Sequence, residues 1–150
     1  MLAAVNWAEV GGLSAVAVAV FTGLAYELGY RNYRRERRER TRRAAVRHLI
    51  GVQMEQGVVM AYDSATTDAQ VGRWREDTKA LIAASLGRAE ATIFNNTEPT
   101  AKLLQLAKEG AISMDQLNAH VGVLGLGSLI QRFDALPVLE DFKPKDSGAK

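Results

Sequence analysis

The 150-residue chain contains no cysteine, only three prolines and only two histidines. Without thiolates it cannot form a disulfide framework, an iron–sulfur cluster or a cysteine-ligated zinc site. Because proline is scarce and 47% of the residues are hydrophobic, a disordered or collagen-like chain is also excluded. A chain of this length suits one modest domain, or a smaller domain with an appendage.

The patterns that mark common catalytic and metal sites are missing as well. His48 and His120 lie in different segments, and neither has a second histidine four residues away, so a histidine metal site is disfavoured. No serine lies in a Gly-x-Ser-x-Gly elbow. The glycine-rich run 122–128 lacks the lysine and the preceding strand of a phosphate loop, and close helix packing explains its glycines better. We therefore expect no enzyme, no cofactor and no metal.

Charge is present but unevenly distributed. Residues 31–47 carry nine arginines and two glutamates, a net charge of +7, which leaves −5 for the rest of a chain whose total is +2. An uncharged apolar segment, residues 10–26, directly precedes these arginines. A helix that crosses a membrane needs roughly 17–25 apolar residues at about 1.5 Å each. The sequence therefore predicts a transmembrane helix over Val5–Tyr26, with Glu9 near a headgroup boundary.

The residues around this span predict its orientation. Aromatic side chains mark the two membrane interfaces, namely Trp7 at one end and Tyr26, Tyr30 and Tyr33 at the other. Arginines that flank a span remain on the cytoplasmic side, so we expect the N-terminus outside and residues 31–150 inside a bacterial inner membrane. Small residues recur every four positions on one face of the span and suggest close packing with a second membrane helix: Gly11, Ala15, Ala19 and Gly23.

The arginine block is predicted to continue the membrane helix, because it has no proline or glycine and contains the i,i+4 pairs Glu36–Arg40 and Glu39–Arg43. The candidate headgroup-binding and topogenic residues are Arg31, Arg34, Arg35, Arg37, Arg38, Arg40, Arg42 and Arg43. Anionic lipid is the favoured ligand, at about 1 kcal/mol per arginine. An acidic protein partner is an alternative, and nucleic acid is disfavoured because no aromatic residue follows Tyr33 within the block.

After Arg47 the apolar residues recur every three or four positions, which predicts helices. The first helix should extend to about residue 61, with Val46, Ile50, Met54, Val58 and Tyr62 on its apolar face. After a polar loop at 63–68, a second helix is predicted over 67–95, a third from a Thr97 cap to Gly110, and a fourth from Ser113 to Pro137. Capping boxes are predicted at Thr67/Gln70 and Ser113/Gln116.

The predicted fold class is all-α: one N-terminal transmembrane helix continues into a cytoplasmic helix and is followed by a small antiparallel helical bundle. The predicted parts are an anchor at 1–30, an arginine-rich juxtamembrane helix at 31–47, a helical domain at 48–139 and a flexible tail at 140–150.

The C-terminal half resembles a known family. The resemblance covers roughly residues 44–142 and rests on Phe94-Asn95-x-x-Glu98, Leu103-Leu104, Gly110-x-Ile112, Leu117, Phe133 and Pro137. It is a bacterial family known only as a domain of unknown function, with a membrane anchor, an amphipathic helix and a helical pair introduced by an Asn-x-x-Glu signature. The resemblance implies an all-helical bacterial membrane protein, and it implies no activity.

These observations predict a single-pass membrane protein whose cytoplasmic helical domain binds other proteins, as an adaptor or as an accessory subunit of a membrane complex. A protein partner or a second copy of the chain is expected. Two alternatives remain open at this point. One is an electrostatic lipid- or nucleic-acid-binding protein that acts through the arginine block. The other is a phage- or toxin-type membrane effector that oligomerises through its short Ala/Val-rich span.

Overall fold

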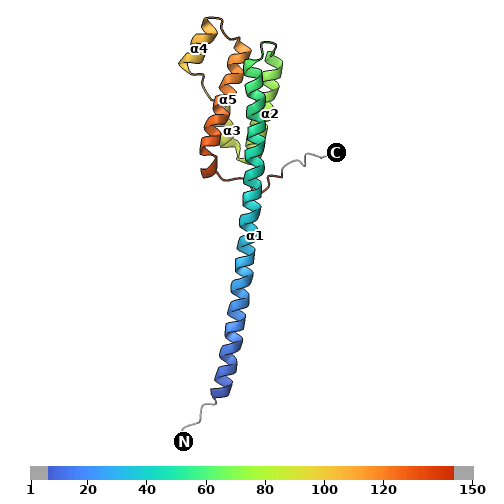
Figure 1. Cartoon of the computed structure of the whole chain (residues 1–150), viewed down its shortest axis with the longest axis vertical. Coiled ribbons are helices and arrows are strands. Elements are labelled where there is room, and N and C mark those ends of the chain that lie inside the picture. The colour runs from blue at the N-terminus through green and yellow to red at the C-terminus, as the bar shows by residue number, and fades with distance from the viewer. Residues whose placement is uncertain (1–6, 144–150) are drawn as a thin grey trace, which may run out of the picture. The chain divides into compact units, whose positions relative to one another are not determined.

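The computed structural model describes the backbone of residues 7–143 and the side chains of residues 18–143. The described chain is all-helical and contains no strand (Figure 1). The elements are α1 (Trp7–Tyr62), α2 (Asp68–Ser85), α3 (Arg88–Asn95), α4 (Ala101–Lys108), α5 (Met114–Arg132) and the short 3-10 helix η1 (Phe133–Ala135). The all-α prediction is therefore confirmed.

Helix α1 is 56 residues long and includes the whole arginine block, as predicted. It ends where the polar loop begins: the Asp63 N–H donates to the Val59 carbonyl oxygen at 3.0 Å, and the Asp63 carboxylate accepts the Ala65 N–H at 2.9 Å. The chain divides into two compact units within this helix, Met1–Arg40 and Thr41–Lys150, and each is described by itself.

In the first unit, every described side chain from residue 18 to residue 40 is exposed. The large apolar ones are Val18, Val20, Phe21, Leu24, Tyr26, Leu28, Tyr30 and Tyr33. Within the described part of the chain, no helix has both the length and the apolar composition needed to cross a membrane. The predicted span Val5–Tyr26 begins outside the described residues, and it stays a prediction.

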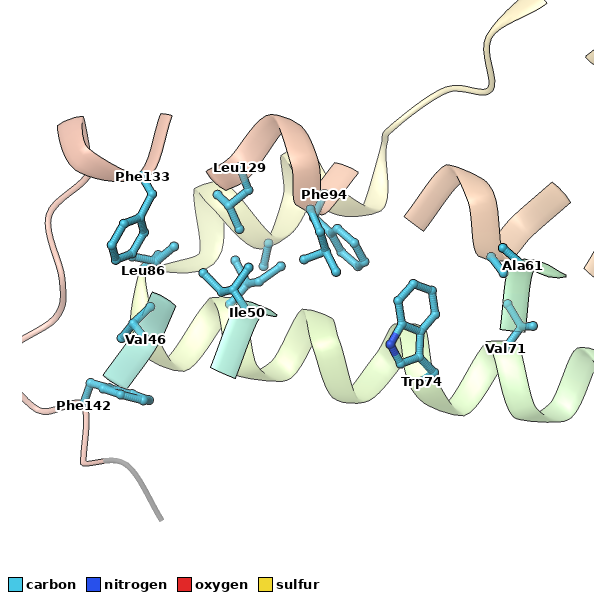
Figure 2. Packing of buried hydrophobic residues seen from close by; sticks show 14 residues of the cluster. Val46, Ile50, Ala61, Val71, Trp74, Leu86, Phe94, Leu129, Phe133 and Phe142 are labelled. Carbon is cyan, nitrogen blue, oxygen red and sulfur yellow. The ribbon is translucent and has the colours of Figure 1, made fainter. Parts of the chain in front are cut away.

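The second unit is a helical bundle with one hydrophobic core. The core lies between α1, α2, α3 and α5, and Figure 2 shows its aromatic members Trp74, Phe94, Phe133 and Phe142. Helix α2 runs antiparallel to α1, because Gln53 contacts Thr78 whereas Gly57, farther along α1, approaches the earlier residue Trp74. Helix α3 packs against α2 and α5, while α4 contacts α5 and contributes no buried residue.

The predicted apolar face of α1 is correct only in its first half. Val46 and Ile50 are fully buried, but Val58 and Tyr62 are 37% and 77% exposed. In place of Val58 and Tyr62, Gly57 and Ala61 face the core and are buried. The reason is the Trp74 ring, which lies so close to α1 that a Cβ at Gly57 would be 2.6 Å from its Cη2 atom. The glycine determines which side of the helix faces the core.

The single helix predicted over 67–95 is wrong, because the chain breaks at Gly87 into α2 and α3. Gly87 has φ +108°, a conformation that side-chain-bearing residues rarely adopt, and its N–H donates to the Ile82 carbonyl oxygen at 3.2 Å. Leu86, the residue before Gly87, is 6% exposed, so the turn between α2 and α3 packs on the core. The break allows α3 to pack against α2 instead of extending into solvent.

The predicted start of the third helix at Thr97 is also wrong. The N-cap is Thr100, whose hydroxyl accepts the Leu103 N–H at 3.4 Å, while the Thr97 hydroxyl donates to Ile93 at the end of α3. The residue before a proline is disfavoured in the helical region, so Pro99 moves the helix start past Glu98. The predicted stop at Gly110 is confirmed by its φ of +72°.

Both predicted capping boxes are confirmed. The Thr67 N–H donates to the Gln70 side chain at 2.9 Å. Ser113 and Gln116 bond reciprocally at 2.9 and 3.1 Å. The last helix ends at Arg132 instead of continuing to Pro137, and the chain closes with the single turn η1.

The segment after η1 packs on the bundle instead of leaving it. The Leu139 N–H donates to the Ser85 carbonyl oxygen at 2.9 Å, and Leu136 and Val138 are partly buried against the core. Phe142 is 8% exposed and lies beside Val46 (Figure 2). The predicted tail 140–150 thus includes a residue, Phe142, that packs on the core, and residues 144–150 lie outside the described part.

Candidate interaction surfaces

The arginines of the first unit are exposed on a helix that packs against nothing else in the described chain of that unit. Arg31 pairs with Glu27 at 2.7 Å, and the Arg34 guanidinium lies 4.8 Å from the centre of the Tyr30 ring. The predicted pair Glu36–Arg40 is confirmed at 3.8 Å, whereas the pair Glu39–Arg43 stays a prediction. Exposed pairs of this kind contribute only about 0–1 kcal/mol each.

These arginines are not distributed evenly around α1. At 3.6 residues per turn, four of them lie within about 100° of arc. Glu36 lies about 100° outside that arc, whereas Glu39 lies about 40° outside it and Glu27 lies within it. We call the four the arginine stripe: Arg31, Arg34, Arg35 and Arg38. Arg37 and Arg40 lie outside this arc.

Two arginines of the second unit bind the bundle itself. The Arg47 guanidinium contacts the Asp134 carboxylate at 2.7 Å and lies 5.4 Å from the centre of the Phe133 ring. The Arg43 guanidinium donates to the Asp134 carbonyl oxygen at 3.5 Å. Together with Ala44 these residues line a hollow of about 240 Å³ between α1 and η1. Arg43 was predicted to bind headgroups, and this contact with η1 was not visible in the sequence.

Of the other predicted interface residues, only part lies among the described side chains. Tyr26, Tyr30 and Tyr33 are 78%, 47% and 60% exposed. Ala19 is exposed, and a Cβ added at Gly23 would meet no atom within 4 Å. Trp7, Gly11 and Ala15 lie among residues 1–17, outside the part of the chain whose side chains are described. Their predicted roles at the membrane interface and in helix packing stay predictions.

A buried polar network that the sequence did not reveal joins α1 to α2. The Thr78 hydroxyl, fully buried, donates to the Gln53 side-chain oxygen at 2.8 Å. The indole N–H of Trp74 donates to the Gln53 carbonyl oxygen at 3.0 Å. Thr78 reads in the sequence as an interruption of an apolar face, but it is a satisfied core residue. No signal in the sequence pairs it with Gln53.

The surface of the bundle carries two further shallow hollows. One, of about 420 Å³, lies between α1 and α2 and is lined mainly by polar side chains: Gln53, Gln56, Met60, Gln70, Arg73, Trp74 and Asp77. The other, of about 340 Å³, lies between α2 and α3. Within the described residues no group of histidines and carboxylates is arranged to hold a metal ion. His48 is exposed, and His120 lies edge-on to Tyr62 at 5.2 Å between ring centres.

The prediction that the glycines of residues 122–128 permit close helix packing is confirmed for two of them. A Cβ at Gly122 would lie 2.6 Å from two ring carbons of Trp74, and one at Gly125 would lie 2.7 Å from the Thr97 hydroxyl oxygen. Both glycines permit close approach, whereas Gly127 faces open space. The resemblance to a family of unknown function stays a prediction. No protein-family model matches the chain, and neither the curated proteins nor the solved structures include a match.

Proposed function

We propose that the chain is a single-pass membrane protein whose helical bundle works as a protein-interaction domain, either as an adaptor or as an accessory subunit of a membrane complex. The observation that carries the proposal is the part of α1 that precedes the arginines. Its apolar side chains from Val18 to Leu28 are exposed on every side of the helix and are followed at once by the arginine block.

The distribution of these side chains favours lipid over a protein groove. Val18, Val20 and Tyr26 lie at least about 80° apart around the helix axis, and each is more than half exposed. A single partner helix covers one face, whereas lipid covers all of them. Burying one large apolar side chain gains about 1.5–3 kcal/mol, so several together supply a firm anchor.

The proposed orientation places residues 31–150 in the cytoplasm at a bacterial inner membrane, because flanking arginines remain on that side. The anchor would confine the bundle to the membrane surface and raise its effective concentration toward partners there. Exposed apolar side chains on the bundle offer contact area for such partners, and Val59, Tyr62 and Met114 are each more than 60% exposed.

Extraction and topology measurements test the anchor directly. We expect the full chain to remain in bacterial membranes after alkaline carbonate washing, and a C-terminal green fluorescent protein fusion to fluoresce while a C-terminal alkaline phosphatase fusion is inactive. Replacing Val16 and Val20 by Asp should release the chain, since a carboxylate near the centre of a span costs about 2.5–3.5 kcal/mol. Release of the unsubstituted chain by carbonate would contradict the proposal.

A matched control separates loss of the anchor from loss of the fold. Asp replacing the exposed residues Val59 and Leu104 of the bundle introduces the same chemistry outside the predicted span. This variant should remain in the membrane fraction. If both variants are released equally, general damage to the protein explains the release.

A further inference from the structure

The arginine stripe is a charged surface that the anchor alone does not need. Its four guanidinium groups recur along α1 with the spacing i, i+3, i+4, i+7, and all four residues are exposed. Two carboxylates flank the stripe: Glu27 pairs with Arg31 at 2.7 Å, and Glu39 lies four residues after Arg35, about 40° around the helix. Between them no acidic residue shares this face, because Glu36 lies more than a quarter turn away. Between Glu27 and Glu39 the stripe therefore carries an excess of positive charge along a straight line of about 10 Å.

Lipid headgroups cover only the beginning of this line. The headgroup layer is about 5–8 Å thick on each side of the hydrocarbon core. If the core ends at Tyr26, Arg31 lies about 7.5 Å beyond it, Arg35 about 13.5 Å and Arg38 about 18 Å, at 1.5 Å per residue. Arg31 thus serves topology, whereas Arg35 and Arg38 lie outside the layer and face the cytoplasm.

The residue type narrows the choice of ligand. All nine basic residues of the block are arginine and none is lysine. Orientation in a membrane requires only positive charge, which lysine supplies equally well. The planar guanidinium adds bidentate hydrogen bonds to a carboxylate or a phosphate. A preference for arginine therefore indicates a partner with such groups.

A second copy of this chain does not fit the stripe. Two parallel helices in contact would bring two blocks of +7 against each other, and like charges directly opposed are destabilising. The partner must carry the opposite sign. A straight stripe with helical spacing matches a second helix whose carboxylates repeat at the same intervals.

We propose that the arginine stripe binds an acidic juxtamembrane helix of a second membrane-anchored protein, an inference that rests on the proposed membrane anchor. The stripe has no apolar residue between Arg34 and Arg38, so the contact consists of exposed ion pairs, which are individually weak. Such pairs hold two free proteins only weakly. Anchoring both helices in one membrane supplies the missing stability through effective concentration.

The test uses the full chain in phosphatidylcholine vesicles with a synthetic transmembrane peptide as the probe. The peptide has a Leu/Ala span and a helical extension with glutamates at i, i+3, i+4 and i+7. Energy transfer between labelled chain and peptide should report association, and a peptide with glutamine at those positions should associate at least tenfold less. Replacing Arg35 and Arg38 by Gln should weaken binding to the glutamate peptide about tenfold.

The matched control removes the same charge from another side of the helix. Arg37→Gln with Arg40→Gln should weaken association less than threefold, with helicity by circular dichroism equal in both variants. Equal losses in the two double variants would overturn the proposal, since diffuse charge then explains binding. Tighter binding of polyuridylate RNA than of the glutamate peptide, lost with Arg35 and Arg38, would also overturn it in favour of nucleic acid.

The two proposals fail in different ways. If carbonate releases the chain from membranes, the anchor is wrong. The stripe is then tested with the glutamate extension alone, without its span, in solution at low salt. Binding that depends on Arg35 and Arg38 supports the stripe in that case, and absence of binding in both formats contradicts it.

Discussion

Trp74 organises the bundle at the scale of single residues. Its ring lies between Gly57 of α1 and Gly122 of α5, and its indole N–H donates to the Gln53 carbonyl oxygen. The tryptophan is 4% exposed, so three helices meet around one side chain. The glycines are required here because any side chain would occupy the space of the ring.

Replacing Gly122 by Ala should destabilise the bundle. The new Cβ would lie 2.6 Å from two ring carbons of Trp74, and overpacking of this kind costs about 1–3 kcal/mol. The matched control is Gly127→Ala in the same helix, where nothing lies within 4 Å and alanine should gain up to about 1 kcal/mol. Urea denaturation of the full chain in mild detergent measures both. Equal stability of the two variants would contradict the packing described.

The sequence predicts many of the buried apolar residues but not the hydrogen-bond partners of the buried polar ones. Periodicity over 67–95 predicts the apolar face Val71, Trp74, Leu81, Ile82, Leu86, Ala89, Ile93 and Phe94. Most of these residues are buried or half-buried, but Ala89 is exposed and Ile93 is 48% exposed. In the sequence Thr78 interrupts the apolar face of its helix. Its role as a buried hydrogen-bond donor becomes clear only when the acceptor of its hydroxyl is known. The acceptor lies 25 residues away on another helix. Long-range polar pairs leave no periodic signal in one sequence.

At the scale of elements, the break between α2 and α3 decides how the bundle closes. The glycine at position 87 is the signal, but a helical glycine and a chain-breaking glycine are indistinguishable in sequence unless the backbone angle is known. Gly72 shows the difference: it lies inside α2 with open space around it, whereas Gly87 has φ +108°.

Alanine at these two glycines should therefore act in opposite directions. Gly87→Ala forces a side chain into a conformation that costs about 1–3 kcal/mol, so the free energy of unfolding should fall. Gly72→Ala removes a flexible residue from a helix interior and should raise it by about 0.5–1 kcal/mol. Thermal unfolding followed by circular dichroism compares them. Stabilisation by Gly87→Ala would show that α2 and α3 prefer to be one helix.

At the scale of the whole molecule, the sequence predicted the helical class and the length of α1 but not how the chain ends. The polar composition after Glu140 indicates a tail, yet Phe142 returns to the core beside Val46. One aromatic residue in a polar segment is too small a signal to outweigh its neighbours. The arginine stripe is likewise contained in the block, but the face that its four arginines share becomes apparent only on a helix.

The packing of Phe142 makes the C-terminal segment part of the folded domain. Phe142→Ala should lower the free energy of unfolding by about 2 kcal/mol, within the range for burial of one large side chain. Leu139→Ala in the same segment should change it by less than about 0.5 kcal/mol, because that side chain is 39% exposed and its bonded N–H remains. Chemical denaturation checks both, and equal effects would contradict the docked segment.

The enclosed position of Trp74 has a spectroscopic consequence. The chain contains two tryptophans, so a Trp7→Phe variant leaves one tryptophan, at the point where α1, α2 and α5 meet, which can be excited selectively over the four tyrosines. Its indole is shielded from water and should emit at short wavelength while the helices remain together. A red shift would report separation of those three helices without any added label. The emission of Trp74 would therefore show whether a partner that binds these helices moves them apart.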